Sequence, residues 1–160
     1  MKKEDIKIVN LRENTEYLEE VSEWLWKEWS ESHGASLEDI IYRSKHSICE
    51  DTIPQMYIAL YNEEVIGVVS LWNNDLTARQ DLTPWMATLF IKEEYRGLGV
   101  GTLLQNKSIE VARNLKYDYL YLITDHVGYY EKNGWKFLEL APLGDGRMTH
   151  IYQYDLKDEK

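Results

Sequence analysis

The sequence predicts one domain of mixed α and β structure that spans residues 1–160. Seven short apolar or alternating segments indicate strands, and between them lie segments with the apolar spacing of amphipathic helices. No repeat, low-complexity tract or linker rich in proline and glycine divides the chain. With 44% hydrophobic and 29% charged residues, the composition is that of a folded domain and not of a disordered tail.

The first third of the chain predicts a strand followed by two helices. Two isoleucines alternate with polar residues over 5–11, which indicates a strand. Asn14 or Thr15 can cap a helix that keeps its apolar residues on one face and runs to about residue 32. The same spacing over 37–48 indicates a second, less regular helix.

The middle of the chain predicts a β-hairpin, a buried strand and a long helix. The apolar runs 56–61 and 65–72 are separated by three polar residues and indicate the hairpin, in which Gly67 lets another backbone approach closely. Residues 85–91 form an apolar run too short for an independent helix, so we expect a buried strand. An apolar stripe over 100–115 indicates an amphipathic helix.

The last third predicts three more strands and a short helix. Residues 119–124 are apolar and indicate a strand. A short helix is expected over 126–133, where Gly134 ends it. Strands over 135–141 and 148–156 complete the domain.

The charge of the chain excludes several classes of partner. The chain has 28 Asp and Glu residues and 18 Lys and Arg residues, which gives a net charge of −10. A protein with this charge is expected to repel nucleic acids and anionic membranes at long range. No signal peptide or membrane span is expected, because no apolar stretch is long enough. The single cysteine, Cys49, has no disulfide partner and no zinc-ligand spacing, which favours the reducing cytoplasm and argues against a metal.

A glycine-rich segment carries the strongest functional signal. Residues 96–102 read Arg-Gly-Leu-Gly-Val-Gly-Thr and lie between the strand 85–91 and the helix that follows. Glycines let the backbone turn tightly and approach a ligand, and the N–H groups of a helix start attract anions. Because Arg96 adds a full positive charge, the segment predicts a site for a pyrophosphate group.

Other interpretations of the glycine segment remain open at this point. It is compatible with a simple turn before a helix. The frame Gly97-x-Gly99-x-x-Thr102 lacks the third glycine of the dinucleotide fingerprint, and no Gly-Lys-Ser/Thr of a P-loop is present. This segment therefore gives only weak support to a dinucleotide-dependent oxidoreductase.

Two segments resemble one known family. Residues 89–101, Leu-Phe-Ile-Lys-Glu-Glu-Tyr-Arg-Gly-Leu-Gly-Val-Gly, resemble the acetyl-CoA-binding motif of the GNAT superfamily of N-acetyltransferases, and residues 129–135, Tyr-Tyr-Glu-Lys-Asn-Gly-Trp, resemble its Tyr-Glu-Lys-x-Gly-aromatic segment. The resemblance implies the acyl-CoA N-acyltransferase fold of the α/β (α+β) class, a mixed, mostly antiparallel sheet of about seven strands flanked by helices. It further implies a cytoplasmic N-acetyltransferase in which a primary amine attacks acetyl-CoA directly.

The resemblance also implies which residues hold acetyl-CoA. The strand 85–91 is expected to bulge and to splay from the strand 119–124, which leaves a slot for the pantetheine arm. Backbone groups in this strand, at Leu89, Phe90 and Ile91, match the positions that bind the acetyl and pantetheine portions. The pyrophosphate site is matched by the loop residues Arg96, Gly97, Leu98, Gly99, Val100, Gly101 and Thr102.

Candidate catalytic residues follow from the same comparison. Tyr130 matches the general acid of the family, and its neighbour Tyr129 is the weaker candidate. The strand 85–91 lacks the carboxylate that many members carry, so Asp81, the nearest acidic residue upstream, is our candidate for contact with the amine or for its deprotonation through water. A turn cap is an equally good interpretation of Asp81.

The acceptor is a small-molecule or peptide amine that the sequence does not identify. The surplus of carboxylates favours a cationic acceptor through electrostatic steering. Trp24, Trp26 and Trp29 cannot share one helix face, so at least one of them is expected to be exposed or to line a cleft. A homodimer is compatible with the resemblance. The alternative function is a CoA-binding sensor or interaction module of the same fold without turnover.

Overall fold

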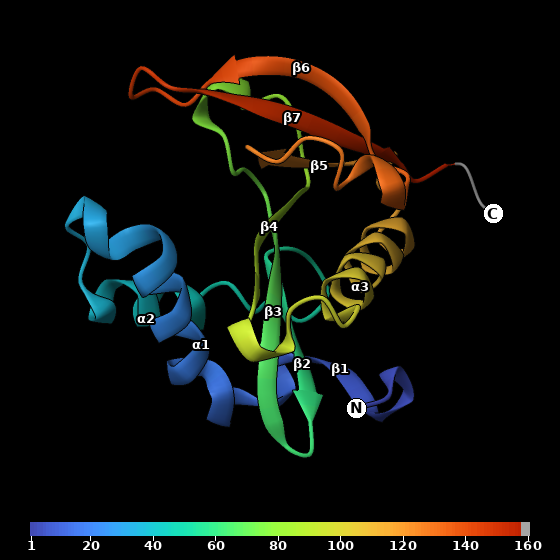
Figure 1. Cartoon of the computed structure of the whole chain (residues 1–160). Helices are drawn as coiled ribbons and strands as arrows, with labels where there is room; N and C mark the ends of the chain where they lie inside the picture. Colours follow the sequence, from blue (N-terminus) through green and yellow to red (C-terminus); the bar gives the residue numbers. More distant parts are fainter. Residues whose placement is uncertain (158–160) are drawn as a thin grey trace.

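The computed structural model describes residues 1–157 and contains a sheet of seven strands in the order β1-β2-β3-β4-β5-β7-β6 (Figure 1). Every neighbouring pair is antiparallel except β4 and β5, which are parallel. The strands are β1 (Ile6–Asn10), β2 (Gln55–Tyr61), β3 (Glu64–Trp72), β4 (Trp85–Ile91), β5 (Tyr119–Thr124), β6 (Lys136–Pro142) and β7 (Met148–Asp155). This mostly antiparallel sheet with flanking helices confirms the predicted fold class.

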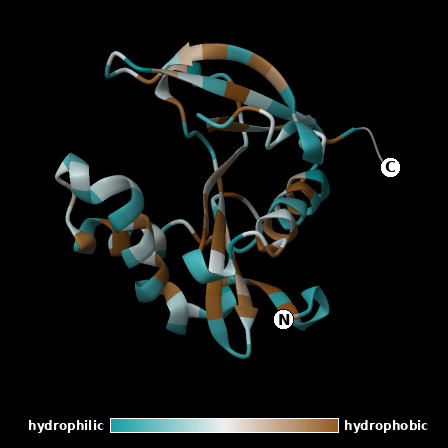
Figure 2. Cartoon of the chain, viewed as in Figure 1, coloured by the Kyte–Doolittle hydropathy of each residue, from teal (hydrophilic) through white to brown (hydrophobic). Residues whose placement is uncertain are grey.

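Three α-helices cover the two faces of the sheet. They are α1 (Leu18–Leu25), α2 (Leu37–Lys45) and α3 (Val100–Asn114). In Figure 1, α1 and α2 lie on one side of β2, β3 and β4, and α3 lies on the other side. Apolar residues follow the central strands and the inward faces of the helices (Figure 2), and they form separate buried clusters on the two faces. The central strands are therefore buried on both sides.

The predicted first helix is a run of four helical segments of three kinds. A 3₁₀ turn at Thr15–Tyr17 leads into α1, which continues through a π-helical turn at Trp26–Ser30 and a 3₁₀ turn at Glu31–His33. Gly34, with a φ of 84°, ends the run. The overall extent of this helical segment agrees with the sequence pattern, but the π-helical turn has no counterpart in that pattern.

Gly67 in β3 has the close backbone neighbour that the sequence predicts. A Cβ at this position would lie 3.2 Å from the carbonyl oxygen of Phe90 and 2.9 Å from Cδ1 of Ile91, both in β4. Leu104 of α3 would be 3.1 Å away. Because Gly67 has no side chain, α3 and β4 can both pack closely against β3 at this position.

The segment before β6 differs from the prediction. Instead of a short helix over 126–133, the structure has a single 3₁₀ turn at Glu131–Asn133. Gly128 has a φ of 91°, which a right-handed helix does not allow, and its N–H group donates to the carboxylate of Glu131 at 3.0 Å. The backbone of this segment therefore forms turns and not a helix.

Within residues 1–157, no helix is both long and apolar enough to cross a membrane.

Candidate active site

A β-bulge in β4 is the first element of the site. Between the register pairs Val68–Phe90 and Ser70–Ala87, β4 contains one residue more than β3. Thr88 in this bulge has a φ of 51°, which is unusual for a β-branched residue. The hydroxyl groups of Thr88 and Ser70 are hydrogen-bonded at 2.6 Å. This contact fixes the bulge in the middle of the sheet.

Beyond the bulge, β4 and β5 separate as the sequence comparison implied. The two strands share one register pair, Trp85 with Tyr121. Next to it, the N–H group of Tyr121 donates to the carbonyl of Pro84 at 3.1 Å. Past this junction lies a cavity of about 680 Å³, lined on its two edges by residues 86–89 and 122–126. The split between these strands is the slot in which a ligand can pair with freed backbone groups.

The start of α3 is the candidate anion site, and its residues 96–102 lie outside the cavity lining. Gly97 and Gly99 have φ angles of 77° and 87°, and Gly99 is the N-cap residue of the helix. The N–H group of Leu103 donates to the carbonyl of Gly99 at 3.2 Å. The N–H groups of residues 100–102 precede this bond, and at a helix start such groups have no partner within the helix. Such groups, at the positive end of the helix dipole, are suited to bind an anion.

Two cationic side chains lie near the anion site. Arg96 donates through Nε to the carbonyl of Ile91 at 2.8 Å, and its guanidinium carbon lies 5.5 Å from the centre of the Phe90 ring. Lys3 lies against Gly99, where a Cβ would be 2.5 Å from Cε of the lysine. Sequence analysis identified Arg96 but missed Lys3, because nothing local connects the N-terminal residues with a loop so distant in the chain.

Tyr130 lines the cavity, and Tyr129 does not. Tyr130 is buried and packs edge-on against Trp135. Burial raises the pKa of Tyr130 to about 12, and the neighbouring Tyr129 adds to the shift. Tyr129 is 44% exposed, and its hydroxyl accepts a hydrogen bond from Nε2 of Gln105 at 3.4 Å. A Cβ at Gly101 would be 3.2 Å from the same hydroxyl, so this pair of tyrosines connects the anion site with the cavity.

The carboxylate of Glu131 holds the turn that carries Tyr130. It accepts the N–H group of Gly128 and the hydroxyl of Tyr152, each at 3.0 Å. The ring of Tyr152 in turn lies 6.2 Å from that of Tyr130. This arrangement positions the Tyr130 side chain although the segment is not helical.

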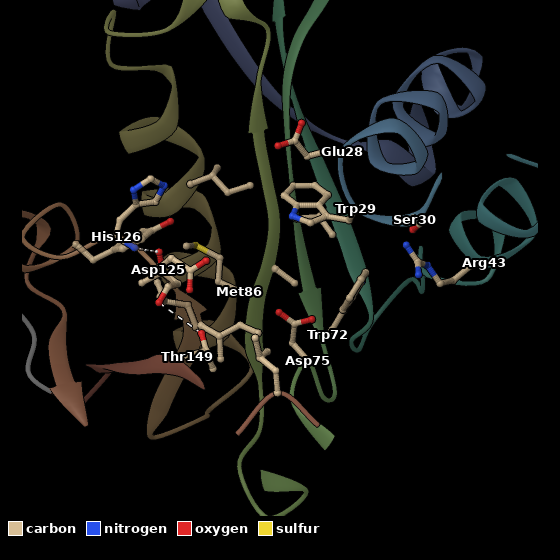
Figure 3. Close-up of a pocket in the computed structure, with 18 residues that line it drawn as sticks. Glu28, Trp29, Ser30, Arg43, Trp72, Asp75, Met86, Asp125, His126 and Thr149 are labelled. Atoms are coloured by element: carbon tan, nitrogen blue, oxygen red, sulfur yellow. Dashed lines mark hydrogen bonds between the residues drawn. The ribbon is translucent and has the colours of Figure 1, made fainter. Parts of the chain in front are cut away.

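The opposite end of the cavity is lined by α2, the π-helical turn and the segment after β3 (Figure 3). Trp29 is 44% exposed, which confirms that at least one tryptophan of the first helical segment lies outside the core. Trp24 packs against Phe90 with ring centres 5.5 Å apart, and Trp26 donates to the carbonyl of Ala35 at 2.7 Å. The polar and aromatic residues at this end are Glu28, Trp29, Ser30, Arg43, Trp72 and Asp75.

Asp75 is the acidic residue of the cavity with the most perturbed environment. Burial raises its pKa to about 7, and the positive charge of Arg43 opposes part of that shift. The guanidinium carbon of Arg43 lies 5.1 Å from the centre of the Trp72 ring, and burial lowers the Arg43 pKa. Sequence analysis missed Asp75. The available signal was its place as the first acidic residue after β3.

The structure does not bring Asp81 into the cavity. Its carboxylate accepts two hydrogen bonds from Arg79, at 2.9 and 2.8 Å, and the same guanidinium also pairs with Glu139 of β6. The hydrogen bonds to Arg79 lower the pKa of Asp81. The geometry is that of an exposed ion pair between a loop and an edge strand. Of the histidines, His126 lines the cavity.

Residues 18–135 match the model of the acetyltransferase (GNAT) family. The chain belongs to this family. No curated protein matches the chain. The GNAT bulge, the slot between β4 and β5 and the glycine loop before α3 all lie within the matched residues, so the family match covers the main parts of the candidate site.

Solved structures agree with the family. An aminoglycoside 6′-N-acetyltransferase in complex with coenzyme A superposes with a TM-score of 0.75 at 15% identity, over 96% of this chain and 99% of that chain. A GNAT acetyltransferase from Staphylococcus aureus Mu50 gives 0.69 at 20% identity, over 94% and 99%. An acetyltransferase from Streptococcus agalactiae 2603 gives 0.67 at 22% identity, over 94% and 98%. At these identities the similarity shows a shared fold.

Replacement of Asp75 by Asn is expected to stabilise the folded chain at pH 8 by up to about 4 kcal/mol. In the folded chain the pKa of Asp75 is raised to about 7, whereas an unfolded aspartate has a pKa of about 3.9. The unfolded chain therefore loses this proton first, and the wild type loses stability as the pH rises from about 4 to 7. Urea denaturation at pH 5 and pH 8 measures the effect, which should be smaller at pH 5.

Asp81→Asn is the matched control for this measurement. Because the pKa of Asp81 is lowered, its carboxylate is ionised in the folded and the unfolded chain from pH 5 to 8. Its effect on the free energy of unfolding should not change over that range. A difference between wild type and Asp75→Asn that is the same at both pH values would contradict the raised pKa of Asp75.

Proposed function

We propose that this GNAT acetyltransferase transfers the acetyl group of acetyl-CoA to a primary amine by direct attack within a ternary complex. The observation that carries the proposal is the cavity that passes the β4 bulge, with Tyr130 on one side and Asp75 on the other. Such a passage brings two reactants together in one geometry, which supplies a large part of the rate enhancement. The acceptor is a small-molecule or peptide amine.

The residues around the slot fit acetyl-CoA. The N–H groups at the start of α3 are complementary to a pyrophosphate, and glycines at 97, 99 and 101 leave the backbone accessible to it. Backbone groups of Leu89, Phe90 and Ile91 in the bulged strand are suited to pair with the amides of the pantetheine arm. The bound co-substrate supplies a thioester, whose carbonyl carbon is the electrophile.

Tyr130 is our candidate for stabilising the leaving sulfur. With a pKa of about 12 the phenol stays protonated at neutral pH. It is a weaker acid than a thiol, whose pKa is about 8.5. Tyr130 therefore assists as a hydrogen-bond donor to the sulfur as negative charge develops there, more than as the source of a fully transferred proton.

Asp75 is our candidate for accepting the proton of the amine. A general base works best when its pKa lies near the working pH, and the pKa of Asp75 is about 7. This carboxylate lines the same cavity as the bulge, whereas Asp81 is held by Arg79 outside it. Asp75 is therefore a better candidate for the proton acceptor than Asp81.

Acetyl-CoA binding and thiol release together test the proposed function. Calorimetry should show binding of acetyl-CoA and CoA but not of NADH, and release of free CoA thiol should depend on the amine that is added. Absence of CoA binding would overturn the proposal. Binding without transfer to any primary amine of a broad panel would favour the non-catalytic CoA sensor instead.

Tyr130→Phe is expected to lower kcat about 100-fold, as removal of one transition-state hydrogen bond does elsewhere. The affinity for acetyl-CoA should change little, because the ring and its packing against Trp135 are kept. Tyr42→Phe is the matched control, since Tyr42 is an exposed tyrosine outside the cavity lining, and it should keep more than half of the activity. Full turnover of Tyr130→Phe would remove Tyr130 from the mechanism.

Asp75→Asn is expected to lower kcat/KM at least tenfold at pH 7.5 with acetyl-CoA affinity retained, because the amine loses its proton acceptor. In the wild type, kcat/KM should fall as the pH drops through about 7, where the Asp75 carboxylate becomes protonated. The acid limb should be absent from the residual activity of Asp75→Asn. The comparison with Asp81→Asn decides between the two carboxylates, and loss of activity in Asp81→Asn alone would reverse our assignment.

A further inference from the structure

We propose that the acceptor carries a carboxylate close to its reactive amine, and that Arg43 binds this carboxylate. The inference rests on the proposed function, since it concerns the acceptor end of the same cavity. It narrows the acceptor from amines in general to amines of the amino-acid type. Net charge alone had favoured a cationic acceptor.

The guanidinium of Arg43 is placed at the cavity wall by stacking. Arg43 extends from α2 toward the cavity, near Ser30 and Trp72 (Figure 3). Its guanidinium carbon is 5.1 Å from the centre of the Trp72 ring, a distance typical of a cation–π contact. The charge of Asp75 attracts it through space, without a hydrogen bond between the two groups. The N–H groups of Arg43 therefore remain available to a ligand.

The indole N–H of Trp72 is a second donor at the same wall. Its Nε1 atom is buried, and among the described residues no acceptor lies within hydrogen-bond distance of it. A buried donor without a partner costs about 1–3 kcal/mol, so such groups are uncommon in native structures. Ser30 adds a hydroxyl to the same part of the lining. A bound acceptor oxygen would satisfy the indole donor.

A carboxylate fits this set of donors better than a neutral group does. The planar guanidinium forms paired hydrogen bonds with carboxylates, and its stacking on an aromatic ring fixes the plane in which they form. The opposite charge of Asp75 lies in the same cavity. An acceptor with neighbouring ammonium and carboxylate groups matches this pair of protein charges. An acceptor with ammonium groups alone would leave both the guanidinium of Arg43 and the Trp72 donor without a partner.

The other charged residues of the lining agree with such an acceptor. Glu28 and Asp125 also line the cavity. Together with Asp75 they make three carboxylates, whereas Arg43 is the one guanidinium in the lining. This balance suits an amine that carries both charges, including an amino acid with a second ammonium group. The acidic surface can still steer such an acceptor toward the cleft.

The test compares amino acids with the amines that remain after their carboxylate is removed. The pairs are L-lysine with cadaverine, L-phenylalanine with phenethylamine and β-alanine with ethylamine, with thiol release as the assay at pH 8.5. This pH keeps Asp75 ionised, so that changes at Arg43 do not act through its protonation. For at least one pair, kcat/KM should be ten or more times higher for the amino acid.

Two variants and one control test whether Arg43 and Trp72 cause the preference for the amino acid. Arg43→Gln should raise KM for the preferred amino acid at least tenfold and bring the ratio within its pair close to one. Trp72→Phe removes the indole donor but keeps a ring, and it should reduce the ratio severalfold. Lys27→Gln is the control, because Lys27 carries the same charge on the π-helical turn but pairs with Glu23 and does not line the cavity.

The outcomes separate this inference from the proposed function. Equal or faster transfer to the decarboxylated amines would overturn the carboxylate proposal and leave the acetyltransferase function standing. So would binding of acetyl-CoA with no transfer to any amino acid while other amines react. A preference for amino acids that survives Arg43→Gln would overturn the role of Arg43. Failure to bind acetyl-CoA at all would overturn the function on which the inference rests.

Discussion

The whole site depends on the separation of two parallel strands in an otherwise continuous sheet. Strands β4 and β5 are joined near Trp85, whose indole donates to the carbonyl of Leu82 at 2.6 Å and whose side chain is fully buried. A few residues later the bulge at Thr88 turns the backbone of β4 out of register with β3. The closed junction keeps the two halves of the sheet together, and the bulge frees backbone groups at the open end. A regular β4 would leave no slot.

The two faces of the sheet divide the chemistry between them. On one face, α3 packs against the strands and directs its N-terminus toward the site expected for the co-substrate. On the other face, α2 and the π-helical turn line the far end of the cavity, and together with α1 they rest on a separate apolar cluster. Because each half rests on its own core, both halves can be rigid while the cavity between them stays open. This arrangement suits a reaction in which two substrates meet at one strand.

The sequence predicted those parts of the site that are local in the chain. The strands 85–91 and 119–124, the glycine loop and Tyr130 each depend on residues close together in the sequence, and the structure has both strands with the predicted limits. Asp75, Arg43 and Lys3 were missed because long-range folding brings them to the site. Asp81 was selected by its distance along the chain, but the hydrogen bonds from Arg79 and the position of its loop could not be read from that distance.

The π-helical turn has a consequence for how this protein can change over time. None of the five side chains of Trp26–Ser30 is fully buried, although three of them line the cavity. Two of these cavity residues, Glu28 and Trp29, are exposed, and substitutions at exposed positions usually alter the free energy of unfolding by only a few tenths of a kcal/mol, about 0.5 at most. New acceptors can therefore be explored by changes in this turn while the bulge and the glycine loop stay as they are. The positions that can change therefore lie in a different segment from the bulge and the glycine loop, which the site needs.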